Sequence, residues 1–254
     1  MDFDVAIKEF KNYTSKYIEL GDSVTLKIDH TFRVMKLCEE IAKSLNFSDE
    51  DIELAKLCGL LHDIGRFEQW KNYQTFADRL SVDHGDLGVK ILTTDNYIRN
   101  FISDDEYDNI ILTSVEFHNK YEIPDGLTEK ELIFTKLVRD ADKIDILYLY
   151  TIGHIELNIE DSYFSDLVYN SLLSRKEILR TDLKTLADKL SISLGFIFDI
   201  NYEKSFDILK NNKYFEIIVN YYKNKSTSDI LKKQLDDVLD VINSYIEKRL
   251  NDVR

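Results

Sequence analysis

The sequence predicts an all-α fold, and three observations lead to this prediction. The 254 residues include only one proline and eight glycines, so turn breakers are few. Hydrophobic residues make up 44% and charged residues 31%, which is typical of a folded globule. Apolar residues recur three or four positions apart in most segments, which is the period of an amphipathic helix. We therefore expect helices throughout a single domain of residues 1–254.

The first half of the chain contains the clearest helical patterns. Across residues 26–45, apolar side chains and His30 share one helical face, so we expect His30 to point into the core. A second apolar helix runs into residues 62–65, where Gly65 is a plausible helix C-terminus. Residues 66–82 lack a clear period, and we expect a loop with one short helix there.

Three further helices carry polar residues of interest. Asp83 can cap the helix that contains His84, an apolar helix precedes His118, and the next helix contains Asp142. Beyond these, residues 151–254 contain apolar helices without histidine–carboxylate pairs, and we expect a helical extension packed on the core. The apolar face of the last helix makes a homodimer a reasonable expectation.

Charge and composition exclude several classes of function. The formal charge of −14 would repel a phosphate backbone, so general nucleic-acid binding is not expected. No apolar run approaches the ~20 residues that span a bilayer, so no membrane association is expected. Cys38 and Cys58 lie within apolar helical patterns, so we expect both to be small core residues and not part of a disulfide framework. A cytoplasmic location is the simplest expectation.

The placement of histidine is the main functional signal. Four of the five histidines lie on or at the end of separate predicted apolar helices, together with two carboxylates in apolar sequence. A lone inward histidine is more often a hydrogen-bonded core residue, and His154 keeps that interpretation. As a set, however, imidazoles and carboxylates suit a transition metal, and coordination removes the cost of burying the carboxylates. The predicted metal ligands are His30, His62, Asp63, His84, His118 and Asp142.

The pattern resembles the HD superfamily of metal-dependent hydrolases. The residues that carry the resemblance are His30, the His62-Asp63 pair within Leu60-Leu61-His62-Asp63-Ile64-Gly65, and Asp142 within Asp140-Ala141-Asp142-Lys143-Ile144-Asp145. The resemblance covers residues 22–150 and implies an HD-type helical core there, with residues 151–254 as the extension.

The two additional histidines resemble those of two-metal members. The resemblance implies that His30, His62 and Asp142 hold one ion, that His84 and His118 hold a second, and that Asp63 bridges them. The ions would be divalent (Mn, Fe, Ni, Co, Mg or Zn), and a metal-bridging hydroxide would be the nucleophile in displacement at phosphorus.

Two cationic side chains are candidates for contact with substrate phosphate. Lys143, next to Asp142, matches a lysine that contacts phosphate in some family members, and Arg66 follows the His-Asp pair. We therefore expect catalytic roles for Asp63 and Lys143, and substrate-binding roles for Lys143 and Arg66.

The predicted function is hydrolysis of a phosphoester in a small molecule, such as a nucleotide or a related metabolite. A phosphodiesterase would fit, although the Gly-Tyr-Pro signature of the cyclic-di-GMP branch is absent after His118. Two alternatives remain open. The same six ligands hold a di-iron centre in HD-type oxygenases, and the chain could also be a non-catalytic nucleotide-binding module.

Overall fold

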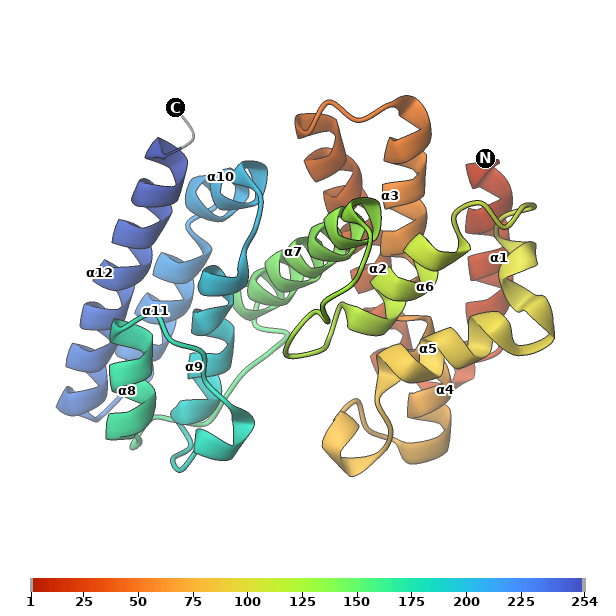
Figure 1. Ribbon diagram of the computed structural model, residues 1–254. Helices are drawn as coiled ribbons and strands as arrows, with labels where there is room; N and C mark the ends of the chain where they lie inside the picture. Colours follow the sequence, from red (N-terminus) through yellow and green to blue (C-terminus); the bar gives the residue numbers. More distant parts are fainter. Residues whose placement is uncertain (1, 253–254) are drawn as a thin grey trace. The chain divides into compact units, whose positions relative to one another are not determined.

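The computed structural model describes residues 2–252, and it is built from α-helices joined by short loops and 3-10 turns (Figure 1). These residues contain no β-strand, so the predicted all-α class is confirmed. The α-helices are α1 (Phe3–Ser15), α2 (Asp22–Ser44), α3 (Asp49–Leu61), α4 (Ile64–Tyr73), α5 (His84–Thr93), α6 (Asp108–Phe117), α7 (Glu129–Thr151), α8 (Asp166–Leu173), α9 (Asp188–Gly195), α10 (Glu203–Asn211), α11 (Tyr214–Lys225) and α12 (Asp229–Asn251).

Contacts divide the chain into two compact units, one up to Asp142 and the other from Lys143 onward. The boundary falls inside α7, so the predicted core of residues 22–150 extends about two helical turns beyond the first unit. We predicted a single domain in which residues 151–254 pack on the core. This depends on how the two units are arranged, and it stays a prediction.

In the first unit, α2 packs along α3, α4 packs against α5, and α5 packs against α6. Gly59 shows how closely α2 and α3 approach each other: a Cβ atom added there would lie 2.7 Å from the Cys38 sulfur. Leu54 and Leu57 of α3 are fully buried. Burial of one such side chain stabilises the fold by about 1.5–3 kcal/mol.

A polar residue caps the start of α5, as predicted for Asp83, and another caps the start of α3. The Asp83 carboxylate accepts hydrogen bonds from the backbone N–H groups of Gly85 (2.9 Å) and Asp86 (3.1 Å). Asp83 thereby caps α5 and places His84 at its first position. Ser48 caps α3 in the same way, through a 3.1 Å bond from the Asp51 N–H.

We expected a loop with one short helix over residues 66–82, and the helix is α4, which begins at Ile64 and extends to Tyr73. The helical period was obscured by Gln69, a polar residue that is fully buried. Its amide donates hydrogen bonds to the Ser81 hydroxyl and the Val82 carbonyl, both at 2.9 Å. Gly65 lies in the first turn of α4 and is not the C-terminus of α3.

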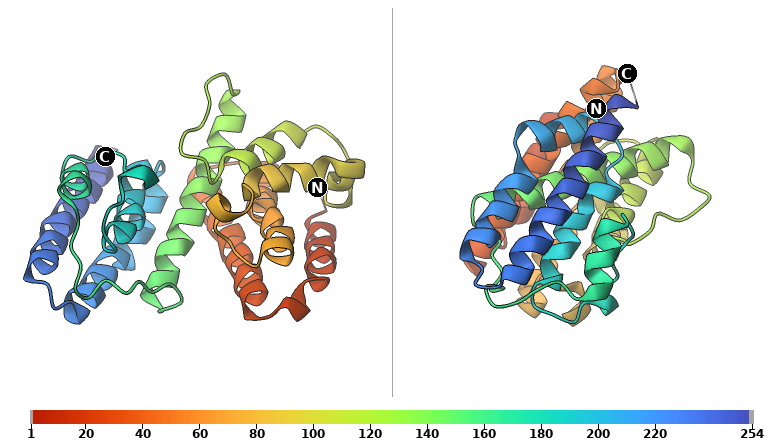
Figure 2. Two further views of the ribbon diagram at one scale, coloured as in Figure 1. Left: turned by 90° about the horizontal axis from the view of Figure 1, so that it is seen from below. Right: turned by 90° about the vertical axis from the view of Figure 1, so that its left-hand side faces the viewer.

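The second unit contains α8 to α12, and α12 packs against α8, α10 and α11 (Figures 1 and 2). The apolar face of α12 is buried within this unit, as shown by Leu235, Val238 and Ile242, which are at most 1% exposed. The pattern that suggested a homodimer therefore has an explanation within one chain, and the homodimer stays a prediction. Within residues 2–252, no helix combines the length and apolar composition needed to cross a bilayer.

Candidate metal centre

Five buried polar side chains from different helices meet in the first unit. His30 lies in the middle of α2, and Asp63 lies in the link between α3 and α4. The other three histidines stand at helix ends: His62 and His118 are the C-caps of α3 and α6, and His84 is the first residue of α5. All five are at most 3% exposed, so each requires a polar partner.

The ligand atoms of these residues form two groups that share Asp63. Asp63 Oδ2 lies 3.5 Å from His30 Nε2 and 3.6 Å from His62 Nε2. Asp63 Oδ1 lies 3.3 Å from His84 Nε2 and 3.6 Å from His118 Nε2. Each carboxylate oxygen therefore faces a different pair of imidazoles.

Asp142 extends the first of these groups from α7. Its Oδ1 lies 3.1 Å from His30 Nε2 and 3.7 Å from His62 Nε2, and its side chain is 15% exposed. The structure thus brings together all six residues that the sequence singled out.

Hydrogen bonds on the far side of three rings define which nitrogen faces the centre. The Nδ1 of His62 donates to the Gly59 carbonyl at 2.7 Å, and the Nδ1 of His118 donates to the Val115 carbonyl at 2.7 Å. The Nδ1 of His84 lies 2.8 Å from the carboxylate of Asp78. With the proton on Nδ1, the lone pair of Nε2 points toward Asp63 in each case.

Burial also keeps two of these rings neutral. Desolvation lowers the pKa of His62 to about 3. Desolvation, followed by the nearby charge of Arg66, lowers the pKa of His84 to about 4. Neutral imidazole and ionised carboxylate are the ligand forms that bind metal, and their lone pairs converge here. The donor set therefore fits divalent cations.

Comparison with known proteins supports this interpretation of the centre. Residues 28–147 match the family model of the HD domain. These residues form a domain of the HD superfamily. HD domains are generally metal-dependent hydrolases that bind divalent cations, and the matched segment contains all six candidate ligands. No curated protein and no solved structure matched the chain.

Lys27, which directly precedes the matched segment, is a feature of the centre that sequence reasoning missed. Its ammonium lies 2.7 Å from Asp63 Oδ2, and its side chain is 16% exposed. Burial would raise the pKa of Asp63, but the charge of Lys27 holds it well below the ordinary value. Lys27 precedes His30 by three residues on α2, so helical spacing could have placed both on one face.

The two predicted phosphate contacts of the HD domain both have protein partners. One Arg66 nitrogen, Nη1, donates to the Phe76 carbonyl at 2.6 Å and to the Asp78 carboxylate at 2.9 Å. The Lys143 ammonium lies 2.7 Å from the carboxylate of Asp199, within the second unit. Their roles in binding substrate stay predictions.

A buried arginine outside the predicted set connects α7 to the end of α6. Arg139 is 4% exposed and donates to the Phe117 carbonyl at 2.9 Å and to the Lys120 carbonyl at 2.6 Å. These bonds flank His118, so they hold the last turn of α6 close to the helix that carries Asp142. Nothing in the periodicity distinguishes this arginine from a surface cation.

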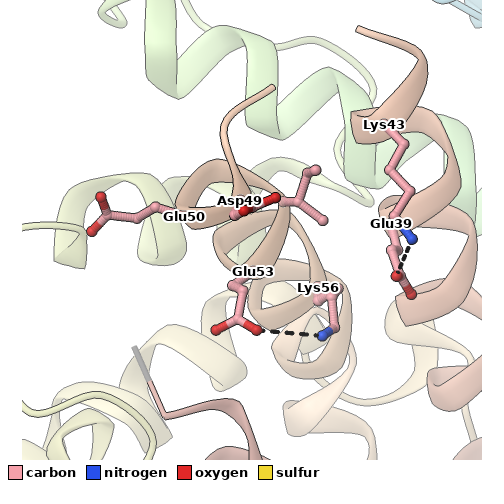
Figure 3. A pocket seen from close by; sticks show the side chains of 7 residues that line it. Glu39, Lys43, Asp49, Glu50, Glu53 and Lys56 are labelled. Carbon is pink, nitrogen blue, oxygen red and sulfur yellow. Dashed lines mark hydrogen bonds and ion pairs between the residues drawn. The ribbon is translucent and has the colours of Figure 1, made fainter. Parts of the chain in front are cut away.

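A hollow on the surface of α2 and α3 is a separate feature of the HD domain (Figure 3). Its charged side chains largely pair within their own helices, as in Lys43 with Glu39 (2.6 Å) and Lys56 with Glu53 (3.8 Å). None of the six candidate ligands lines it. The hollow therefore gives no indication of a second functional site.

Proposed function

We propose that this chain is a metal-dependent phosphohydrolase that cleaves a phosphoester of a small molecule, such as a nucleotide or a related metabolite. The observation that carries the proposal is the arrangement around Asp63, whose two oxygens face different pairs of imidazoles. Such a carboxylate suits a pair of cations that share it. Membership of the HD superfamily supports the reaction class.

In this proposal, His30, His62 and Asp142 hold one divalent cation, His84 and His118 hold the other, and Asp63 contacts both. When bound, the cations supply Lewis-acid charge for phosphate oxygens and lower the pKa of a coordinated water. The protein holds the imidazoles in one tautomer, so that no proton has to be moved before the ligands engage.

Positive side chains next to Asp63 can assist with an anionic substrate. Lys27 contacts one oxygen of Asp63, and the Nε of Arg66 lies 3.4 Å from the other. Lys27 is partly exposed, so its ammonium can reach a phosphate oxygen without being extracted from the core. Lys143 remains the third candidate for such a contact.

The test compares two histidine variants of the purified protein. We expect His62→Ala to lose bound metal and the release of phosphate or nucleoside from a panel of nucleotides. His154→Ala is the matched control because His154 is the one histidine outside the cluster, and it is exposed. It should retain wild-type metal content, about two ions per chain, and wild-type turnover.

Three outcomes would contradict the proposal. Full hydrolysis in a chelated sample would remove the role of the metal. Oxygen uptake by iron-loaded protein, without phosphate release, would favour a di-iron oxygenase. Tight nucleotide binding without turnover under any metal would favour a binding module.

A further inference from the structure

His84 is held differently from His62 and His118. His62 and His118 follow their helices, so each ring donates to a carbonyl three residues earlier, in Gly59 and Val115. His84 begins α5 and has no preceding helical turn that could offer such a carbonyl. An acceptor for its Nδ1 must therefore come from elsewhere in the fold.

That acceptor is Asp78, in the short 3-10 turn Asp78–Leu80 that precedes α5. Its Oδ2 lies 2.8 Å from His84 Nδ1 and 3.3 Å from the amide nitrogen of Asn119. Its Oδ1 accepts from Arg66 Nη1 at 2.9 Å and from Gln69 Nε2 at 2.8 Å. All four partners direct a donor toward Asp78, so this position requires a group that only accepts, which is an ionised carboxylate.

We propose that Asp78 is a positioning residue that fixes the tautomer and orientation of His84 and so determines cation affinity at the His84–His118 side of the centre. This inference rests on the proposed metal centre. A carboxylate that accepts from the outer nitrogen of an imidazole makes the inner nitrogen a stronger ligand. The rings of His62 and His118 donate to neutral carbonyls, so His84 differs from these two in having a carboxylate as acceptor.

An experiment can distinguish the proposed positioning role of Asp78 from a purely structural role. We would titrate chelator-stripped protein with Mn²⁺ and follow the occupancy of each site by calorimetry and by electron spin resonance. Asp78→Asn places an amide N–H₂ against at least one donor, and it removes the negative charge next to His84. We expect it to weaken one of the two Mn²⁺ sites by about 10–100-fold, the range for loss of such partners, and to leave the other site unchanged.

Asp83→Asn is the matched control. Asp83 is a neighbouring carboxylate whose side chain has the same 31% exposure as that of Asp78, and its bonds go to the N–H groups of Gly85 and Asp86, the Lys120 ammonium and the Asn119 amide. Asparagine is also a good N-cap, so α5 should remain intact. We expect wild-type affinity at both Mn²⁺ sites in this variant.

A spectroscopic measurement distinguishes a local change at His84 from poor folding of the variant. Nitrogen NMR of the imidazoles in metal-free wild-type protein should show the His84 proton on Nδ1, and Asp78→Asn should alter this signal while those of His62 and His118 stay the same. Wild-type affinity at both sites in Asp78→Asn would overturn the inference, as would equal weakening of both sites. If wild-type protein binds two Mn²⁺ ions but hydrolyses no phosphoester, the proposed function fails while the titration still decides the role of Asp78.

Discussion

Two buried aspartates, one in each unit, show how differently this protein uses the same side chain. Asp188 in the second unit is fully buried and accepts four hydrogen bonds, each 2.8–2.9 Å long. Its donors are the backbone N–H groups of Ser165, Lys184 and Thr185 and the Ser165 hydroxyl. Asp63 in the first unit is 2% exposed and is surrounded mainly by imidazole nitrogens whose lone pairs point toward it.

The difference distinguishes a structural carboxylate from a functional one. Asp188 is satisfied by fixed donors and ties the segment before α8 to the start of α9. Asp63 has the ammonium of Lys27 as a close donor, at 2.7 Å, while its other near neighbours are mostly acceptors. A buried carboxylate among acceptors is stabilised further when a cation arrives, so burial alone says little about role until the chemistry of the neighbours is known.

The largest expected effect is the loss of function at Asp63. Because replacement of an outer partner already costs about 10–100-fold in metal affinity, Asp63→Asn should cost more than that and abolish turnover. The variant also removes the buried charge that faces the ammonium of Lys27 at 2.7 Å, so chelated Asp63→Asn should be less stable than chelated wild type, by no more than about 3–5 kcal/mol. Metal titration and urea unfolding of the same samples check both statements, and wild-type metal affinity in the variant would contradict the comparison.

The opposite result is expected at Asp188. Asp188→Ala leaves buried N–H groups without an acceptor, at a cost of about 1–3 kcal/mol for a group left unsatisfied, so we expect a loss near the top of this range. Metal affinity and turnover per folded molecule should stay at wild-type values. Asp188→Asn keeps one acceptor oxygen, so its unfolding free energy in urea should lie between those of wild type and Asp188→Ala.

Metal loading should protect the two units unequally. Ligand at 100 times its dissociation constant stabilises the state that binds it by about 2.7 kcal/mol. Native-state hydrogen exchange should therefore slow in α3, α5 and α6 when metal is added, whereas α8 and α12 should exchange at unchanged rates. Equal protection of all five helices would show that the units unfold together.

The smallest expected effect is a pH dependence of stability that comes from Asp188. Burial raises its pKa, but the N–H donors of Lys184, Thr185 and Ser165 outweigh burial, and its pKa lies below the ordinary value. A lowered pKa means that the contribution to stability is full above the unfolded pKa of about 3.9 and is lost as the pH falls through the folded value. The stability difference between wild type and Asp188→Ala should thus be constant from pH 7 to 5 and shrink below about pH 4, as measured by urea unfolding at each pH.

The six candidate ligands could be found from sequence because helical periodicity governs their surroundings. His30 shares a face with apolar residues of α2, and it is fully buried as predicted. His62 and His118 follow the ends of apolar helices, and the capping residue Asp83 indicates the start of the helix that begins with His84. Each of these signals is local, within one or two helical turns.

The residues that support the ligands could not be found in the same way. Asp78, Gln69 and Asn119 lie in different elements and meet only after the chain has folded, so no spacing connects them. Gln69 lies in a segment without a clear period, so no face could be assigned to it from sequence, but its amide donates to groups of the loop before α5. The partners of Arg66 and Lys143 likewise come from positions that periodicity cannot relate to them.

The glycine two residues after the His-Asp pair has a consequence for the spacing of the candidate ligands. A Cβ atom at Gly65 would lie 2.2 Å from the His84 carbonyl oxygen and 2.8 Å from the Gly88 nitrogen, so α4 and α5 touch backbone to backbone. Such a contact cannot adjust by a change of rotamer. Any side chain larger than hydrogen at this position would push α4 away from α5, and with them Asp63 away from His84.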